Sequence, residues 1–124
     1  MKRINHFIPL ILFILISSIS TAQEKSTALQ HVLLFDWKEQ VEPAQREGIL
    51  DLFRGLVAKV EGFEDLIIED VTASSGPYDM VLILEFLSEA ALAAYEEHPD
   101  HIKISEDAPP LLDGFLAFDF NGKF

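Results

Sequence analysis

Cysteine is absent from all 124 residues. Without thiols the chain can form no disulfide, no thiolate zinc site and no iron–sulfur cluster, and it lacks a cysteine nucleophile and a cysteine lipid anchor. Basic residues are also few: nine stand against 21 acidic residues, which gives a formal net charge of -12. Because such a surface repels phosphate backbones and anionic membranes, nucleic-acid binding is not expected.

Several sequence motifs are missing as well. Neither G-x-x-x-x-G-K nor G-x-G-x-x-G occurs, so we expect no nucleotide cofactor, and without G-x-S-x-G no serine triad is indicated. The acidic runs at 61–70 and 96–107 lack the glycine and spacing of a calcium loop, so they are expected to be solvated faces. Hydrophobic residues make up 49% of the chain, which indicates one folded domain.

The N-terminal residues have the pattern of a secretory signal. Lys2 and Arg3 precede a ten-residue apolar run, Phe7–Ile16, and small residues follow in Ser17–Ala22. An uncleaved membrane anchor is the alternative, but a span needs roughly 17–25 apolar residues and this run falls short. We therefore expect residues 1–22 to be removed near Ala22, leaving an exported protein, periplasmic or secreted, that is not held in a membrane.

After the signal, the hydrophobic pattern predicts four strands and two main helices. A polar lead-in covers residues 23–30, one domain covers residues 31–120 and a tail covers residues 121–124. The predicted strands are apolar or aromatic runs at His31–Trp37, Phe63–Thr72, Tyr78–Phe86 and Gly114–Phe120.

The first helix is expected to begin at Pro43 and to end before Gly62. Its apolar face repeats at helical spacing through Ile49, Phe53, Leu56, Val57 and Val60. Ser88 is a plausible N-cap for the second helix, which His98 and Pro99 interrupt. Because Pro109 and Pro110 follow, residues 100–112 are expected to form only one or two short turns.

This β-α-β-β-α-β order predicts an α+β fold, the ferredoxin-like plait. Its four-stranded antiparallel sheet has the strand order 4-1-3-2, with both helices on one face. The two central strands are apolar on both faces, although a half-exposed antiparallel sheet normally alternates apolar and polar residues. The second face is therefore expected to be covered, either by a second copy in a two-fold homodimer or by the C-terminal segment.

Several segments resemble the stress-responsive A/B barrel (Dabb) domains, which are dimeric α+β barrels. The matching features are HVLLFDWK at 31–38, EPAQRE at 42–47, YDMVLILEF at 78–86, LAAYEEHPDH at 92–101 and FLAFDF at 115–120. Together they cover nearly all of residues 30–120. The resemblance implies the same plait and a homodimer whose two sheets form a barrel.

The resemblance also implies a pocket between helices and sheet. Plant polyketide cyclases of this family use that pocket for aldol-type ring closure, and related dimers are cofactor-free monooxygenases. His101 and Tyr95 match the cyclases' central catalytic pair, while His31 and Asp119 match residues that line the same site. Phe53 and Met80 stand where the plant cyclase has a tyrosine and a histidine, which makes the expected pocket more apolar.

The predicted topology also brings these residues together. Because the first and last strands are antiparallel neighbours, His31 should lie near Asp119, unless a one-residue slip turns Asp119 away. A neutral histidine such as His101 could then abstract a proton next to a carbonyl, Tyr95 could hydrogen-bond the oxyanion, and Asp119 could fix an imidazole tautomer.

Structural roles are the alternative for each residue. Tyr95 could be a core aromatic, His101 a turn residue, and His31 a partner of a neighbouring loop, while Asp119 could be exposed at an edge. His98 could simply end a helix. A metal at His98-x-x-His101 is not favoured, because Pro99 distorts the spacing.

The sequence thus predicts an exported Dabb-like homodimer that binds a small apolar or aromatic molecule and needs no cofactor or metal. The first alternative is a cofactor-independent enzyme of the cyclase, isomerase or monooxygenase type that uses His101 and Tyr95. The second is a dimeric assembly module without a ligand, which would have a filled cavity blocked by Phe53 and Met80. Whether the protein is an enzyme stays open at this point.

Overall fold

The computed structural model describes residues 28–123; the predicted signal peptide at 1–22 lies outside this range. Its elements follow the predicted order with one addition, a third helix. They are β1 (Leu29–Trp37), α1 (Pro43–Lys59), β2 (Phe63–Asp70), β3 (Met80–Phe86), α2 (Glu89–Glu97), α3 (Pro99–Asp107), the 3-10 turn η1 (Pro109–Leu111) and β4 (Leu112–Asn121).

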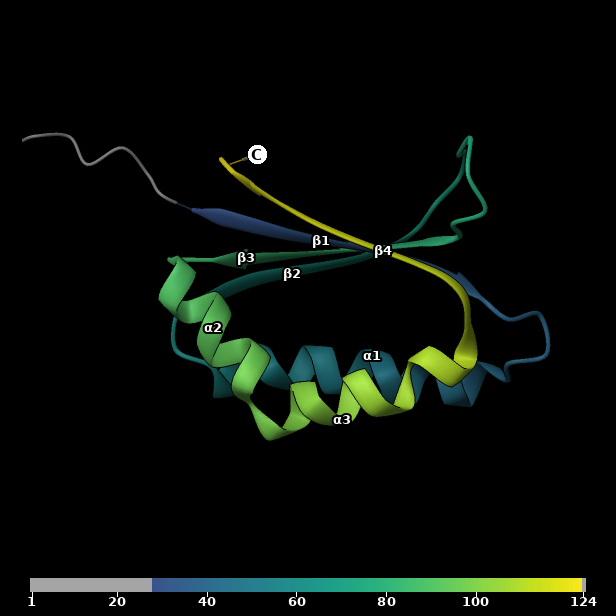
Figure 1. Ribbon diagram of the computed structural model, residues 1–124, viewed down its shortest axis with the longest axis horizontal. Coiled ribbons are helices and arrows are strands. Elements are labelled where there is room, and N and C mark those ends of the chain that lie inside the picture. Colours follow the sequence, from purple (N-terminus) through teal and green to yellow (C-terminus); the bar gives the residue numbers. More distant parts are fainter. Residues whose placement is uncertain (1–27, 124) are drawn as a thin grey trace, which may run out of the picture.

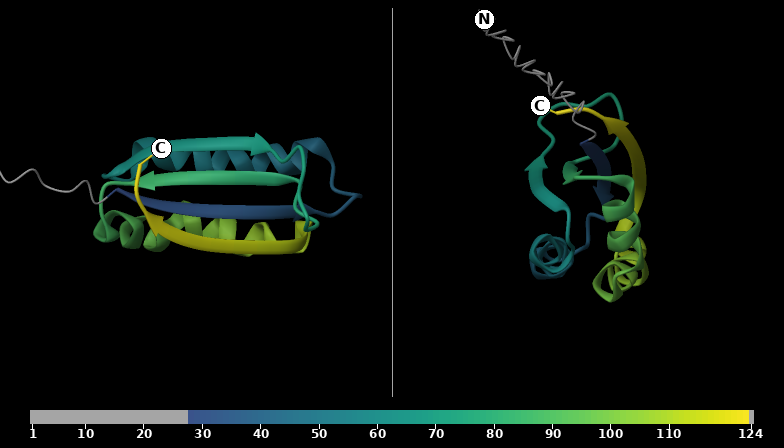
Figure 2. Two further views of the ribbon diagram at one scale, coloured as in Figure 1. Left: turned by 90° about the horizontal axis from the view of Figure 1, so that it is seen from above. Right: turned by 90° about the vertical axis from the view of Figure 1, so that its left-hand side faces the viewer.

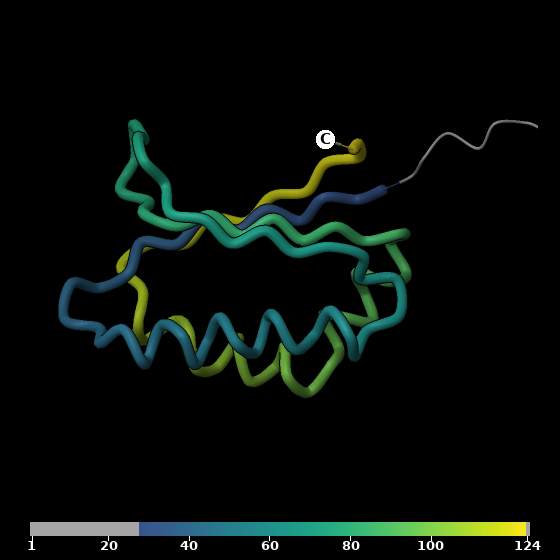
Figure 3. The backbone as a smooth tube through the Cα atoms, turned by 180° about the vertical axis from the view of Figure 1, so that it is seen from behind, coloured from purple at the N-terminus to yellow at the C-terminus, as the bar shows by residue number. Residues whose placement is uncertain are grey.

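The four strands form one antiparallel sheet in the order β2-β3-β1-β4, as predicted. Among residues 28–123, every helix lies on the same face of this sheet, and the opposite face carries none of them (Figures 1 and 2). The backbone trace shows α1 running beneath the sheet for most of its length (Figure 3). β1 begins at Leu29, inside the predicted lead-in, and β4 extends one residue beyond the predicted domain end, to Asn121.

The ends of α1 follow from local chemistry. Pro43 is the first helical residue, and the Gln45 side chain accepts a 3.0 Å hydrogen bond from the backbone N–H of Glu42. Gly62 turns the chain after the helix with φ of +83°. A Cβ at this position would lie 2.7 Å from the Cβ of Ala91, so the close packing of α2 on this turn requires glycine.

The segment after α2 differs from the prediction. Residues 100–112 were expected to form one or two short turns, but Pro99–Asp107 is a nine-residue helix. Pro99 stands at the first helical position, where a missing N–H costs nothing, so this proline starts α3. His98 does end α2, as expected, and its Nδ1 also caps α3 by accepting a 3.1 Å hydrogen bond from the N–H of Asp100.

The core lies between the helices and one face of the sheet. Apolar side chains from β1, β3, α1 and α2 fill it, and every one of these is less than one-tenth exposed. The most deeply buried large residues of this core are Phe35, Leu50, Phe53, Leu56, Leu82, Leu84, Phe86 and Tyr95. Phe53 and Leu56 belong to the predicted face of α1, and this helix therefore packs as its spacing indicates.

The other sheet face is left uncovered by the described helices, and it carries apolar residues beside a polar pair, Gln30 and Glu85, that hydrogen-bond to each other. One row across it runs Ile67, Ile83, Val32 and Phe118, because these residues are opposite each other in the three strand pairings. Ile67 is 39% exposed and Phe118 is 46% exposed. Most of the C-terminal segment forms the edge strand β4, but its last described residues cross one end of this face (Figure 2). There the carbonyl oxygen of Gly122 accepts a hydrogen bond from Gln30, and Lys123 lies beside Ile67 and Ile83.

No helix among residues 28–123 combines the length and the apolar character that crossing a bilayer requires.

Candidate functional site

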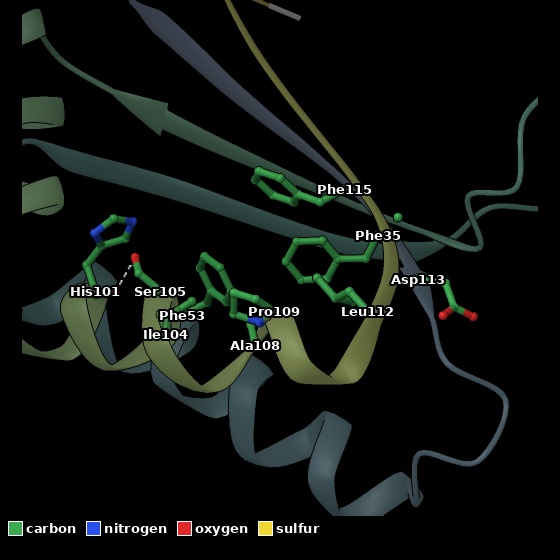
Figure 4. A pocket seen from close by; sticks show the side chains of 11 residues that line it. Phe35, Phe53, His101, Ile104, Ser105, Ala108, Pro109, Leu112, Asp113 and Phe115 are labelled. Atoms are coloured by element: carbon green, nitrogen blue, oxygen red, sulfur yellow. Dashed lines mark hydrogen bonds between the residues drawn. The ribbon is translucent and has the colours of Figure 1, made fainter.

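A pocket of about 370 Å³ lies between α3, α1 and the helix-facing side of β1 and β4 (Figure 4). Phe35 of β1, Phe53 of α1 and Phe115 of β4 line it. The ring centroid of Phe35 lies 6.2 Å from that of Phe53 and 5.8 Å from that of Phe115. The other lining residues belong to α3 and the segment after it: His101, Ile104, Ser105, Ala108, Pro109, Leu112, Asp113 and Gly114.

The volume and lining are typical of a small-molecule site. Ligand pockets occupy roughly 300–1,000 Å³ and combine apolar walls with a few polar groups. Here the polar side chains are His101, Ser105 and Asp113. Figure 4 shows His101 at one end of the pocket and Asp113 at the other, with the Asp113 carboxylate pointing outward.

His101 lies in the first turn of α3, and its ring has a defined tautomer. Its Nδ1 lies 2.9 Å from the backbone carbonyl oxygen of Glu96. Since a carbonyl oxygen can only accept, Nδ1 carries the hydrogen and donates it. No described residue hydrogen-bonds Nε2, so this atom presents a lone pair when the imidazole is neutral.

Tyr95 of α2 is fully buried behind His101. The centroid of its ring lies 4.4 Å from that of His101 and 6.0 Å from that of His31. Its hydroxyl is buried and has no hydrogen-bond partner among residues 28–123. Burial, with a smaller contribution from the charge of Glu96, raises the pKa of Tyr95 far above its ordinary value. The hydroxyl therefore stays protonated.

His31 and Asp119 are direct partners, as the predicted topology requires. They are opposite each other in the β1–β4 register, and His31 Nδ1 lies 2.5 Å from an Asp119 carboxylate oxygen. The His31 side chain is 13% exposed and that of Asp119 is 44% exposed. The register slip that would turn Asp119 away is absent from this pairing, and Asp119 fixes the His31 tautomer with hydrogen on Nδ1.

The predicted residues thus separate into two connected groups. His101 and Phe53 line the pocket, whereas the described lining does not include Tyr95, His31 or Asp119. These three residues form a cluster next to the pocket, and the tilted ring contact between Tyr95 and His101 joins the two groups.

Met80 lies apart from both groups. It is partly buried against the core and stands opposite Phe35 in the β1–β3 pairing, and it is not among the described residues that line the pocket. Met80 therefore packs against the margin of the hydrophobic core.

Sequence reasoning missed most of the pocket wall. The register that pairs His31 with Asp119 also pairs Phe35 with Phe115, because Phe35 follows His31 by four residues and Phe115 precedes Asp119 by four. That signal was available from the predicted topology. Ile104, Ser105 and Ala108 were missed because α3 was expected to be no more than short turns.

The histidines of the H-x-x-H segment do not converge. His98 Nδ1 accepts from the backbone of Asp100, and His101 Nδ1 donates to the backbone of Glu96. Within residues 28–123, no group of three or more histidine, aspartate or glutamate side chains is arranged to hold a metal ion.

The fold and site define a ferredoxin-like α+β protein with a pocket between its helices and sheet. Residues 29–122 match the Stress responsive A/B Barrel Domain family, Dabb. Because this match covers most of the chain, the protein belongs to the Dabb family. No curated protein matches the sequence.

Solved structures share this fold. A dimeric ferredoxin-like protein of unknown function from Thermobifida fusca is 25% identical, with a TM-score of 0.66 over 77% of this chain and 91% of that chain. A Dabb family protein from Mesorhizobium loti is 20% identical, with a TM-score of 0.66 over 78% and 98%. The hydroxynitrile lyase from Passiflora edulis is 10% identical, with a TM-score of 0.72 over 80% and 96%. The last two likenesses concern the fold alone.

Proposed function

We propose that this Dabb protein binds a small apolar or aromatic molecule in the pocket between its helices and sheet. The observation that carries the proposal is a pocket of about 370 Å³ with phenylalanine side chains from three different elements. Aromatic pairs are worth about 0.5–1.5 kcal/mol beyond the area that they bury. An open pocket of this kind supports ligand binding over a role in assembly alone, for which a filled cavity was expected.

Filling the pocket tests this proposal. Ser105 is an exposed residue of α3 that lines the pocket, so Ser105→Trp places an indole there without disturbing the buried core. Ile102 is also exposed on α3 and does not line the pocket, so Ile102→Trp is the matched control. We expect calorimetry to show naphthalene binding to the wild type and to Ile102→Trp, and at least about tenfold weaker binding to Ser105→Trp. Absence of binding to the wild type, or equal binding to all three, would contradict the proposal.

The second part of the proposal is a homodimer formed through the uncovered sheet face. The exposed apolar side chains of Ile67, Leu116 and Phe118 support it, because soluble proteins rarely leave large apolar patches in water. The dimeric Thermobifida fusca relative supports it too. We expect the wild type to sediment as a dimer and Phe118→Asp as a folded monomer; a monomeric wild type at high concentration would overturn this part.

A cofactor-independent enzyme is the second candidate function. The observation in its favour is the contact of the Tyr95 ring with both His31 and His101. Neutral His101 can accept a proton at Nε2 from a substrate in the pocket. Tyr95, whose hydroxyl is buried outside the pocket lining, packs its ring against this imidazole and positions it. Proton abstraction of this kind is the chemistry of a cyclase or an isomerase.

Its test is the turnover of a synthetic polyketide thioester. A general base contributes roughly 10²–10⁴-fold, so His101→Ala is expected to lose activity by that factor. Asp119→Asn keeps the shape of its side chain but removes the charge that orients His31, and is expected to lower the rate less. Unchanged turnover in His101→Ala would reject the role of His101.

We propose export from the sequence of residues 1–22. The positive start, the apolar run and the small residues before Gln23 support it. Intact-mass measurement of protein recovered outside the cytoplasm is the corresponding test.

A further inference from the structure

The polar groups of the pocket restrict the chemistry of its ligand. In neutral His101, Nδ1–H is already donated to the carbonyl of Glu96, which leaves only the lone pair of Nε2. The Ser105 hydroxyl donates to the carbonyl oxygen of His101 at 3.0 Å, so its oxygen can only accept further bonds (Figure 4). Asp113 at the other end carries a carboxylate, which also accepts.

The lining therefore offers acceptors and no free side-chain donor. Phe35, Phe53, Phe115, Ile104, Leu112, Ala108 and Pro109 supply no polar side-chain atom. The backbone N–H groups of Ala108 and Leu112 are also occupied, by the carbonyl oxygens of Ile104 and Pro109. No lysine or arginine lines the pocket in the described part of the chain.

From this hydrogen-bond inventory we infer that the pocket selects hydroxylated aromatic molecules, whose O–H donates to Nε2 of His101 while the ring packs among the three phenylalanines. The inference rests on the proposed binding function and names the ligand class for the same pocket. A ligand that only accepts hydrogen bonds finds no partner at His101. An anionic ligand loses its hydration and gains no cation among the residues that line the pocket.

The affinities of four matched bicyclic aromatic compounds distinguish ligands that donate a hydrogen bond from ligands that only accept one and from anionic ligands. Naphthalene measures the apolar contribution, 2-naphthol adds a donor, 2-methoxynaphthalene blocks that donor and 2-naphthoate adds a negative charge. All four compounds are titrated in the same buffer at about pH 8, above the ordinary pKa of about 6.5 of a free imidazole. Because one neutral hydrogen bond contributes about 0.5–1.5 kcal/mol, we expect 2-naphthol to bind roughly threefold to tenfold more tightly than 2-methoxynaphthalene. We expect 2-naphthoate to bind more weakly than naphthalene.

Two substitutions at His101 test the origin of this preference. His101→Leu removes the acceptor, so the ratio of 2-naphthol to 2-methoxynaphthalene affinity is expected to fall to about one while naphthalene still binds. In His101→Gln the side-chain carbonyl can accept near the former position of Nε2, and part of the preference is expected to return.

The outcomes distinguish this inference from the proposed function. If naphthalene binds and the hydroxyl gives no advantage, or if His101→Leu keeps the full advantage, the inference on ligand class is wrong and the apolar pocket stands. Tightest binding of 2-naphthoate would also overturn the inference. If none of the compounds binds the wild type, the proposed function itself fails.

Discussion

The buried hydroxyl of Tyr95 is expected to lower the stability of the folded protein. Tyr95 is fully buried, and its ring packs on Phe63, Phe86, His31 and His101. The hydroxyl has no hydrogen-bond partner in the described chain. Tyr95→Phe removes this oxygen and keeps the ring, so every aromatic contact is retained. The substitution is therefore expected to stabilise the protein.

The magnitude follows from the cost of the unpaired group. A buried hydroxyl without a partner costs about 1–3 kcal/mol, against which the phenylalanine leaves a small void. We expect Tyr95→Phe to raise the free energy of unfolding by about 1 kcal/mol. For a domain of this size, that corresponds to a rise in Tm of about 4–8 °C.

Thermal and urea denaturation measure this change. Tyr78 is only partly buried, so Tyr78→Phe is the matched control and is expected to change stability by less than about 0.5 kcal/mol. A loss of stability in Tyr95→Phe would show that the hydroxyl has a partner, such as a buried water molecule, and would refute the reasoning.

Burial of the Tyr95 hydroxyl also predicts that the protein loses stability at alkaline pH. The folded state holds the pKa of Tyr95 far above its ordinary value of about 10, so above about pH 10 the unfolded chain releases this proton and the folded protein keeps it. The resulting loss of stability approaches about 1.4 kcal/mol for each pH unit. Tyr95→Phe is expected to lack this contribution; equal alkaline slopes in the two proteins would contradict the raised pKa.

Two further predictions concern the turn after α1 and the N-terminus. Gly62→Ala is expected to lower the free energy of unfolding by about 1–3 kcal/mol in urea, because φ is +83° and the new Cβ would clash with Ala91. In Gly48→Ala no atom lies within 4 Å of the new Cβ, so this variant is expected to raise the free energy of unfolding by about 0.5–1 kcal/mol. The same change in stability in both alanine variants would contradict this reasoning. Intact-mass measurement of exported protein is expected to show a chain that begins at Gln23, whereas a retained Met1 would refute cleavage near Ala22.

The sheet was predictable because its signals are local and repeated. Runs of apolar and aromatic residues located the strands, and the order of elements identified the plait, which in turn placed His31 beside Asp119. The third helix was not predicted because Pro99 and Pro109 were interpreted as helix breakers. In the structure Pro99 begins α3 and Pro109 begins η1, positions at which proline is favourable.

The candidate site was only partly predictable for a related reason. His101 and Phe53 line the pocket, but the wall formed by Ile104 and Ala108 depends on α3. Burial of the Tyr95 hydroxyl also depends on how α2 packs on the sheet, which periodicity does not specify. Tertiary packing therefore determined what the local pattern left open.

The most direct test of the pocket is a crystal structure of the protein soaked with 1-bromonaphthalene, whose bromine is located by anomalous scattering. We expect a bromine peak in the pocket, among Phe35, Phe53 and Phe115. A peak only on the uncovered sheet face, or no ordered bromine at all, would contradict the proposed binding function.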